Sequence, residues 1–285
     1  MFRFVQWELA GSVGPVSGRY VVRPHAGEGA EHVLVIAAGS GSAPARRGRR
    51  WGRESDAAGA PAAVPLTRAT VIEAEPEPDL DRAQAWLETA AGEGAEATVA
   101  AALAVLNRAV RGHRIAAADP YVAEVAPWRA LVTRVGYGTG DEVADARWTE
   151  ARELQPPPVT RAERRDAALR PQERLAALLG GRDAALACEE LTLRGRLDLD
   201  HGRDREAALQ VHLALEAARV ELAAWGALTG MADRIGDLDA RRDAVAGAAN
   251  EALQGGLRAE TRETVAEALA RVEAALRARA AAGAY

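Results

Sequence analysis

Three consecutive prolines, Pro156-Pro157-Pro158, divide the chain into two halves with different hydrophobic rhythms. Proline has a fixed φ and no backbone N–H, so such a run stops a helix and stiffens the linker that contains it. Before the run, short segments rich in aromatic and β-branched residues alternate with glycine and proline breaks, whereas after it apolar residues recur at helical spacing. The sequence therefore predicts a mixed α+β domain over 1–155 and a helical domain over 159–285.

The first domain is expected to contain a small, mainly antiparallel sheet and two helices. Five short segments have strand composition: Phe2–Leu9, Arg19–Arg23, His32–Ala37, Arg68–Ala74 and Trp128–Val135. Helices are predicted over Leu80–Ala90 and Glu96–Arg111, and the second carries an apolar stripe at helical spacing. The segment Glu142–Leu154 fits either a strand or a helix.

Between the third and fourth predicted strands, residues 39–66 consist mainly of Gly, Ser, Ala, Pro and Arg, which is typical of a mobile loop. The loop carries five arginines from Arg46 to Arg53, and Trp51 among them could stack on a nucleic-acid base. A solvated loop is the favoured interpretation, because the chain has 41 acidic against 36 basic residues and a net charge of −5. Nucleic acid is therefore not an expected partner.

The second domain is expected to be a bundle of about five helices. Capping and breaking residues set the predicted helix boundaries: Pro171 to Gly180, Asp183 to Asp200, Asp204 onward, Arg234–Leu253 and Ala259–Ala281. Asp183 and Asp204 are the predicted N-caps of their helices. The predicted fold class is thus α+β, a small mainly antiparallel N-terminal sheet with two helices followed by a C-terminal helical bundle.

Three of these helices carry apolar stripes that predict their contact faces. The stripes are Ala184, Cys188, Leu191, Gly195 and Leu199 on the first, Leu209, Leu213, Ala217, Val220 and Ala224 on the second, and Val265, Leu269, Val272 and Leu276 on the last. Small residues on the first stripe favour close helix contact. The last stripe is a candidate surface for self-association.

Within the helical domain, Gly202-Arg203, the run from Glu206 to Leu209 and the run from Ala214 to Glu216 follow a familiar turn and second-helix pattern. The segment Leu191–Glu216 resembles one unit of a tetratricopeptide-type helical hairpin. The resemblance implies two antiparallel helices with small residues where they touch. It covers about one repeat and lacks the first-helix Trp and Gly-Tyr signature, whereas a solenoid needs three or more repeats.

Composition excludes several kinds of chemistry. The chain contains no lysine, so no Schiff-base or P-loop lysine is available. Cys188 is the single cysteine, which excludes an intrachain disulfide and a thiolate cluster, and its place on an apolar stripe predicts a buried, inert thiol. His201 and His212 do not have the H-E-x-x-H spacing. No metal and no cofactor are therefore predicted.

The sequence also bears on location. Charged residues interrupt the start of the chain before an apolar region develops, so no signal peptide is predicted. No apolar run approaches the ~18 residues of a membrane span. The abundance of Ala, Gly, Arg and Val indicates a GC-rich, bacterial genome. We expect a cytoplasmic protein.

The region 113–148 is the one stretch where polar, charged and aromatic residues gather outside helical periodicity. Because pockets are lined by such mixtures, it supplies the candidate ligand-binding residues: His113, Asp119, Tyr121, Glu124, Arg134, Tyr137, Asp141 and Trp148. His113 and Asp119 would form an acid–base pair if the fold brought them within hydrogen-bond reach. The favoured alternative is that the aromatic residues fill the core of the domain and the charges form its solvated rim.

Within that region, the run from Gly136 to Asp141 has the spacing G-x-G-x-G. It is predicted to be a turn, with a phosphate-binding loop as the alternative.

Two functions follow from these observations. The leading hypothesis is a non-enzymatic interaction or scaffold protein, which binds a protein partner or a second copy through its helical domain. The alternative is an enzyme or small-ligand-binding protein with a pocket in the 113–148 region.

Overall fold

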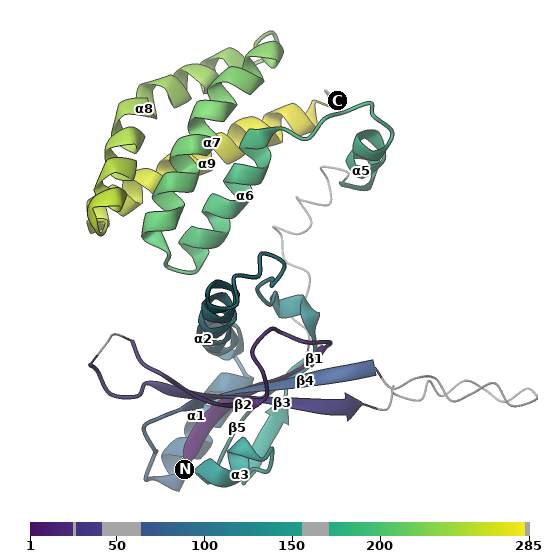
Figure 1. Cartoon of the computed structure of the whole chain (residues 1–285), viewed down its shortest axis with the longest axis vertical. Helices are drawn as coiled ribbons and strands as arrows, with labels where there is room; N and C mark the ends of the chain where they lie inside the picture. The colour runs from purple at the N-terminus through teal and green to yellow at the C-terminus, as the bar shows by residue number, and fades with distance from the viewer. Residues whose placement is uncertain (25–26, 42–63, 156–170, 283–285) are drawn as a thin grey trace, which may run out of the picture. The chain divides into compact units, whose positions relative to one another are not determined.

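A computed structural model describes residues 1–24, 27–41, 64–155 and 171–282 (Figure 1). The chain forms two compact units, Met1–Pro158 and Val159–Tyr285. The predicted arginine loop from Arg46 to Arg53 and the three prolines lie outside the described residues. None of the described helices is both long and apolar enough to cross a membrane.

The N-terminal unit contains a six-stranded antiparallel sheet with the strand order β2-β3-β4-β1-β5-β6. Its strands are β1 (Phe2–Ala10), β2 (Gly18–Val22), β3 (His32–Gly41), β4 (Val64–Glu73), β5 (Ala130–Gly138) and β6 (Glu150–Glu153). Its helices are α1 (Leu80–Ala91), α2 (Ala95–Ala116) and α3 (Gly140–Ala144), with a 3-10 turn η1 (Pro127–Arg129). Together with the helices of the second unit, this sheet confirms the predicted α+β fold class.

The main core of this unit lies between one face of the sheet and the helices α1 and α2. Side chains alternate between the two faces of a strand, so Val5, Trp7 and Leu9 of β1 all point toward the helices. The predicted apolar stripe of α2 is confirmed, because Leu103 and Leu106 are buried against this face. This core sets the distance between α2 and the sheet.

The opposite face of the sheet is partly covered by α3. Val143 and Ala144 of α3 pack with Phe4, Val35 and Ile72 in a smaller buried cluster. The segment that fitted either strand or helix is therefore both, since α3 precedes β6. The short helix is placed where a run of sheet residues would otherwise be exposed.

The glycine run predicted as a turn or a phosphate loop is strand for its first half. Gly136 and Gly138 both belong to β5, and α3 begins at Gly140. A Cβ atom at Gly136 would lie 2.5 Å from the carbonyl oxygen of Glu150 and 2.8 Å from the ring of Phe4. Glycine is present because β6 and a core phenylalanine approach the backbone closely, so the loop prediction was wrong here.

The C-terminal unit contains a bundle built from α5 (Pro171–Leu179), α6 (Ala187–Asp200), α7 (Asp204–Glu221), η2 (Leu222–Trp225), α8 (Met231–Gln254) and α9 (Ala259–Ala281). Gly195 of α6 shows how closely α6 and α7 pack, since a Cβ there would lie 3.0 Å from Val211 Cγ2. Small residues at the contact are what the resemblance to a tetratricopeptide hairpin implies. The buried thiol predicted for Cys188 is confirmed.

Two of the predicted contact stripes need correction. On α7 the side chains of Leu213 and Val220 are 53% and 75% exposed, because the buried face consists mostly of alanines one or two positions away. On α9 the residues Val265, Leu269 and Val272 are fully buried in the core of the bundle itself. The α9 stripe is therefore not a surface that a second copy can reach.

The predicted cap at Asp183 was also wrong. α6 begins at Ala187, and its first N–H groups are bound by Glu221, whose carboxylate accepts from Ala187 N (3.1 Å) and Cys188 N (2.9 Å). The cap thus comes from the end of α7 and not from the preceding residue. Asp204 is the first residue of α7, with Arg203 in the cap position.

Asp183 instead belongs to a buried ionic cluster around Arg279. Arg279 is 1% exposed, and its guanidinium lies 2.6 Å from Asp183 Oδ1, 3.3 Å from Glu189 Oε1 and 4.3 Å from the centre of the Trp225 ring. Burial favours a higher pKa for Asp183, but hydrogen bonds from the Ala184 N–H and from the Arg279 guanidinium lower it overall. The cluster connects α9 to the segment before α6.

Candidate functional site

The structure places the eight candidate residues in several different environments. His113, Asp119 and Tyr121 line a shallow cavity of about 390 Å³ near the C-terminal end of α2. Glu124 is half-buried and does not line this cavity. The remaining four lie in the sheet, in α3 and in the segment between α3 and β6.

In the shallow cavity, the predicted acid–base pair is not formed. The His113 ring packs on Gly14, where a Cβ would lie 2.9 Å from the ring carbon Cδ2. Asp119 Oδ1 accepts a hydrogen bond from the backbone N–H of Tyr121 (2.9 Å), and the Tyr121 side chain is 91% exposed. Among the described residues, no hydrogen bond joins His113 to Asp119. This arrangement orders a loop and offers a ligand few directed groups.

Tyr137 is a core residue that faces α1 and α2. Its hydroxyl donates to Glu150 Oε2 at 2.9 Å, and burial, together with this carboxylate, raises the pKa of the phenol.

Arg134, Asp141 and Trp148 lie on or beside the opposite face of the sheet. Arg134 forms ion pairs with Glu8 (2.6 Å) and Glu153 and lies 5.9 Å from the Trp148 ring centre. Asp141 pairs with Arg19 of β2 at 3.1 Å. These side chains are engaged in contacts within the fold.

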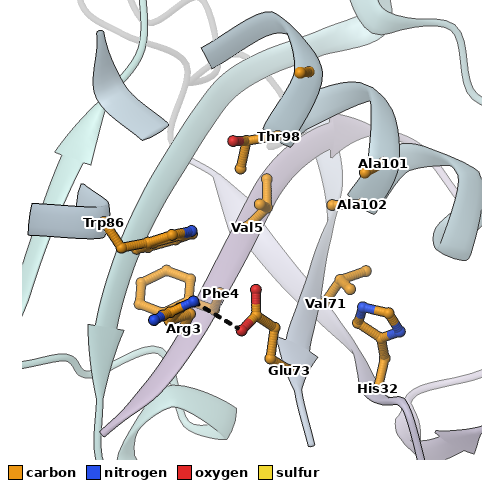
Figure 2. A pocket seen from close by; sticks show the side chains of 11 residues that line it. Arg3, Phe4, Val5, His32, Val71, Glu73, Trp86, Thr98, Ala101 and Ala102 are labelled. Carbon is orange, nitrogen blue, oxygen red and sulfur yellow. Dashed lines mark ion pairs between the residues drawn. The ribbon is translucent and has the colours of Figure 1, made fainter. Parts of the chain in front are cut away.

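A second cavity, of about 330 Å³, lies between the sheet and the N-terminal half of α2 (Figure 2). Its existence follows from the side chains of that helix. A helix rests on a sheet through its largest buried side chains, and in α2 these are Leu103 and Leu106. The first turns carry Ala97, Thr98 and Ala101, which are too small to fill the same gap. The sheet beneath them is left partly uncovered.

The floor of this cavity carries a row of polar side chains from three adjacent strands: Arg3 of β1, Glu73 of β4 and His32 of β3. His32 and Glu73 are direct partners in the register of β3 and β4. Side chains of such a pair leave the sheet about 5 Å apart on the same face. Figure 2 shows both pointing into the cavity, with Val5 and Val71 as apolar floor.

Arg3 closes one side of the cavity together with Trp86 of α1. Its guanidinium donates to Glu77 Oε2 at 2.7 Å, lies 3.7 Å from Glu73 Oε2, and sits 5.5 Å from the centre of the Trp86 ring. The hydrogen-bonded partner is thus Glu77, whereas Glu73 makes only the longer ion-pair contact. Arg3 and Trp86 form one wall of the cavity, and their contacts with each other and with the two glutamates hold both side chains in place.

Two atoms at the cavity are buried without a hydrogen-bond partner among the described residues, Nε of Arg3 and Nδ1 of His32. The nearest ionic neighbour of His32 Nδ1, Glu31 Oε2, is 3.7 Å away. The Glu73 side chain is 42% exposed and receives no side-chain hydrogen bond from the residues that the structure describes. Because buried polar atoms in native proteins are nearly always paired, the two buried atoms mark a position for a polar group.

Sequence reasoning missed this second site, although a signal was present. Arg3 precedes the buried Val5 by two positions, His32 precedes Leu34 by two, and Glu73 follows Val71 by two. Strand side chains alternate with a period of two, so each polar residue shares the face of its buried neighbour. That the three meet depends on the strand order, which the sequence does not reveal.

No group of three or more His, Cys, Asp or Glu residues in the described part of the chain is arranged to hold a metal ion. Comparison of the chain with protein-family models, with curated protein sequences and with solved structures found no match.

Proposed function

We propose that the N-terminal unit binds a small organic molecule in the cavity beneath the first turns of α2. The observation that supports this most directly is the pair of buried atoms at the cavity, Arg3 Nε and His32 Nδ1, that have no hydrogen-bond partner among the described residues. The volume of about 330 Å³ is at the lower end of the range for small-molecule sites, which combine an apolar lining with a few directed polar groups.

The cavity also has the mixed lining that a ligand requires. Val5 and Val71 supply apolar floor, and Trp86 supplies an aromatic wall held by its contact with Arg3. An apolar body would be desolvated against these side chains while its polar end met the polar row of the floor. The proposal places the site at the opposite end of α2 from the region favoured by the sequence.

A filling substitution tests the proposal. Ala101 is exposed at the mouth of the cavity, so Ala101→Leu places a larger side chain there without disturbing the buried core. Ala104→Leu is the matched control, because Ala104 is exposed on the same helix but does not line the cavity. Three probes of similar shape, phenethylamine, 2-phenylethanol and 3-phenylpropionate, are titrated into the full chain and followed by NMR at Trp86 Nε1–H and the Thr98 amide.

We expect at least one probe to shift both resonances in a saturable way. Ala101→Leu should weaken that binding at least tenfold, whereas Ala104→Leu should leave it unchanged. The proposal is overturned if no probe shifts these resonances, or if binding persists undiminished in Ala101→Leu.

A second candidate function is self-association through the helical unit, and it has its own supporting observation. Helices α6 and α7 lie against each other and both contact α9, so their outward residues face away from it. Four large aliphatic side chains are exposed on these helices: Leu193, Leu197, Leu213 and Val220. Such exposed apolar side chains are typical of interaction surfaces when they are contiguous.

A second copy of the chain is the partner that this surface favours. An isologous interface must be complementary to itself, and the exposed ion pair between Glu190 and Arg194 on α6 provides both signs of charge beside the leucines. Light scattering coupled to size-exclusion chromatography should then give a dimer for the native chain and a monomer for Leu193→Glu. A native monomer at about 100 μM would contradict self-association.

A further inference from the structure

We infer that the cavity beneath α2 selects an organic cation, a molecule with an ammonium group at the end of an apolar or aromatic body. This inference rests on the proposed function and adds the chemical class of the ligand. Glu73 is the counter-charge, and His32 supplies a second acceptor for the same ammonium group.

The charges around the cavity favour a cation. The ionisable groups that line it are Arg3, His32 and Glu73, and two further carboxylates lie just behind them, Glu77 at 2.7 Å from Arg3 and Glu31 at 3.7 Å from His32. Arg3 is paired with Glu77, so the Glu73 carboxylate is the lining charge whose nearest cation, Arg3 at 3.7 Å, is already engaged, and an added cation restores balance.

The contacts of Arg3 disfavour an anion as well. Its Nε–H is buried without a hydrogen-bond partner, but the guanidinium already has the Glu77 carboxylate bound to it and the Glu73 carboxylate 3.7 Å away, and both would repel an anion. Nδ1 of His32 accepts a hydrogen bond when the ring proton is on Nε2, and the half-exposed carboxylate of Glu73 receives no side-chain hydrogen bond from the described residues. An ammonium group has three donors and no acceptor, which is complementary to this pair.

The geometry allows one ammonium group to reach both acceptors. His32 and Glu73 are direct cross-strand partners in β3 and β4, and Figure 2 shows their side chains rising side by side from the floor. Val5 and Trp86 then lie beside the body of the ligand. A primary amine on a short linker to a ring fits this arrangement, because its charged end contacts the acceptors and its ring is desolvated.

The three probes above discriminate this class, since they differ in the charge of one end group. Phenethylamine should bind the full chain at least tenfold more tightly than 2-phenylethanol, and 3-phenylpropionate should bind most weakly. Glu73→Gln, which keeps the shape and removes the charge, should weaken phenethylamine about tenfold and leave 2-phenylethanol unchanged. Glu75→Gln is the matched control, because Glu75 is exposed two positions further along and does not line the cavity.

The outcomes separate the two proposals. If 2-phenylethanol or 3-phenylpropionate binds as tightly as the amine, the cation class is overturned while ligand binding stands. If no probe binds, ligand binding itself fails. The ranking of the probes on the native chain does not depend on any variant, so a Glu73→Gln chain that failed to fold would leave that ranking as the deciding result.

Discussion

Two arginines in different regions of the molecule contact the same kinds of side chain but differ in how far they are exposed to solvent. Arg3 in the N-terminal unit and Arg279 in the C-terminal unit each contact two carboxylates and stack over a tryptophan ring. Arg279 is almost completely buried, whereas the side chain of Arg3 is 24% exposed beside a cavity. The shortest distance from the guanidinium to a carboxylate is 2.7 Å for Arg3 and 2.6 Å for Arg279, and the distance to the tryptophan ring centre is 5.5 Å and 4.3 Å. One cluster fixes the fold, and the other leaves space beside it.

Alanine shows the same contrast between the units. Ala207, Ala214 and Ala218 of α7 are fully buried, because small residues let neighbouring helices approach closely. In α2 the alanines leave a cavity, since Leu103 and Leu106 further along the helix hold it away from the sheet. Small side chains thus produce close packing only where the whole contact surface is small.

The largest expected loss of stability comes from removing Arg279 from its buried ionic cluster. Arg279→Ala should destabilise the C-terminal unit by about 3–5 kcal/mol, because it leaves the buried carboxylate of Asp183 without its closest cation. Hydrogen exchange measured in α6 and α9 reports the loss. Arg271→Ala is the control, because its ion pair with Asp237 is more than half exposed on the arginine side and should contribute at most about 1 kcal/mol.

Acid should act on the same cluster. The pKa of Asp183 is lowered in the folded state, so its contribution to stability is present above the ordinary carboxyl pKa of about 4 and is lost as the pH falls toward the lowered folded value. The protection factors of the α9 amides, which remove the intrinsic pH dependence of exchange, should therefore fall below about pH 4. If the protection factors in this helix do not change between pH 5 and 2.5, Asp183 does not stabilise the fold as its contacts indicate.

Removing Arg3 from its contacts with Glu73, Glu77 and Trp86 should destabilise the N-terminal unit much less. Arg3→Ala is expected to cost about 1 kcal/mol, because the guanidinium is partly solvated and its contact with Glu73 is long. Hydrogen exchange of the β1 and β4 amides, measured as a function of urea concentration, gives this loss of stability. A loss as large as that for Arg279→Ala would remove the contrast between the two regions.

The smallest effect is expected for Ala101→Leu, which should change the stability of the N-terminal unit by about 0.5 kcal/mol or less. The substitution adds an aliphatic side chain at a mouth that is open. A loss above about 2 kcal/mol, measured by the same exchange experiment, would show that the cavity is smaller than the structure indicates.

Much of the fold was predictable from local patterns. The helix over Ala259–Ala281 has the same bounds in the structure as in the prediction, because Gly255 and Gly256 interrupt the chain before it. The five predicted strands occur with shifts of a few residues at their ends, and the fourth begins four residues earlier. Hydrophobic period and breaking residues are sufficient for such elements.

What could not be predicted depends on distant partners. On α7 the period was right but the chosen face was wrong, since the leucine at 213 faces outward and alanines fill the contact. The cap of α6 comes from Glu221, more than thirty residues away, so a rule based on adjacent residues selected Asp183. The candidate site was placed at the aromatic-rich end of α2, whereas the polar row of Arg3, Glu73 and His32 forms only when β1, β4 and β3 align.

The single cysteine is a natural probe of transient opening in the C-terminal unit. Cys188 is fully enclosed, and burial, with Glu221 beside it, raises the pKa of its thiol, so the folded chain presents no thiolate to a reagent. Alkylation of the chain can then proceed only through states in which α6 has separated from its neighbours. The rate of labelling by an excess of iodoacetamide therefore measures how often this helix opens, without any engineered probe.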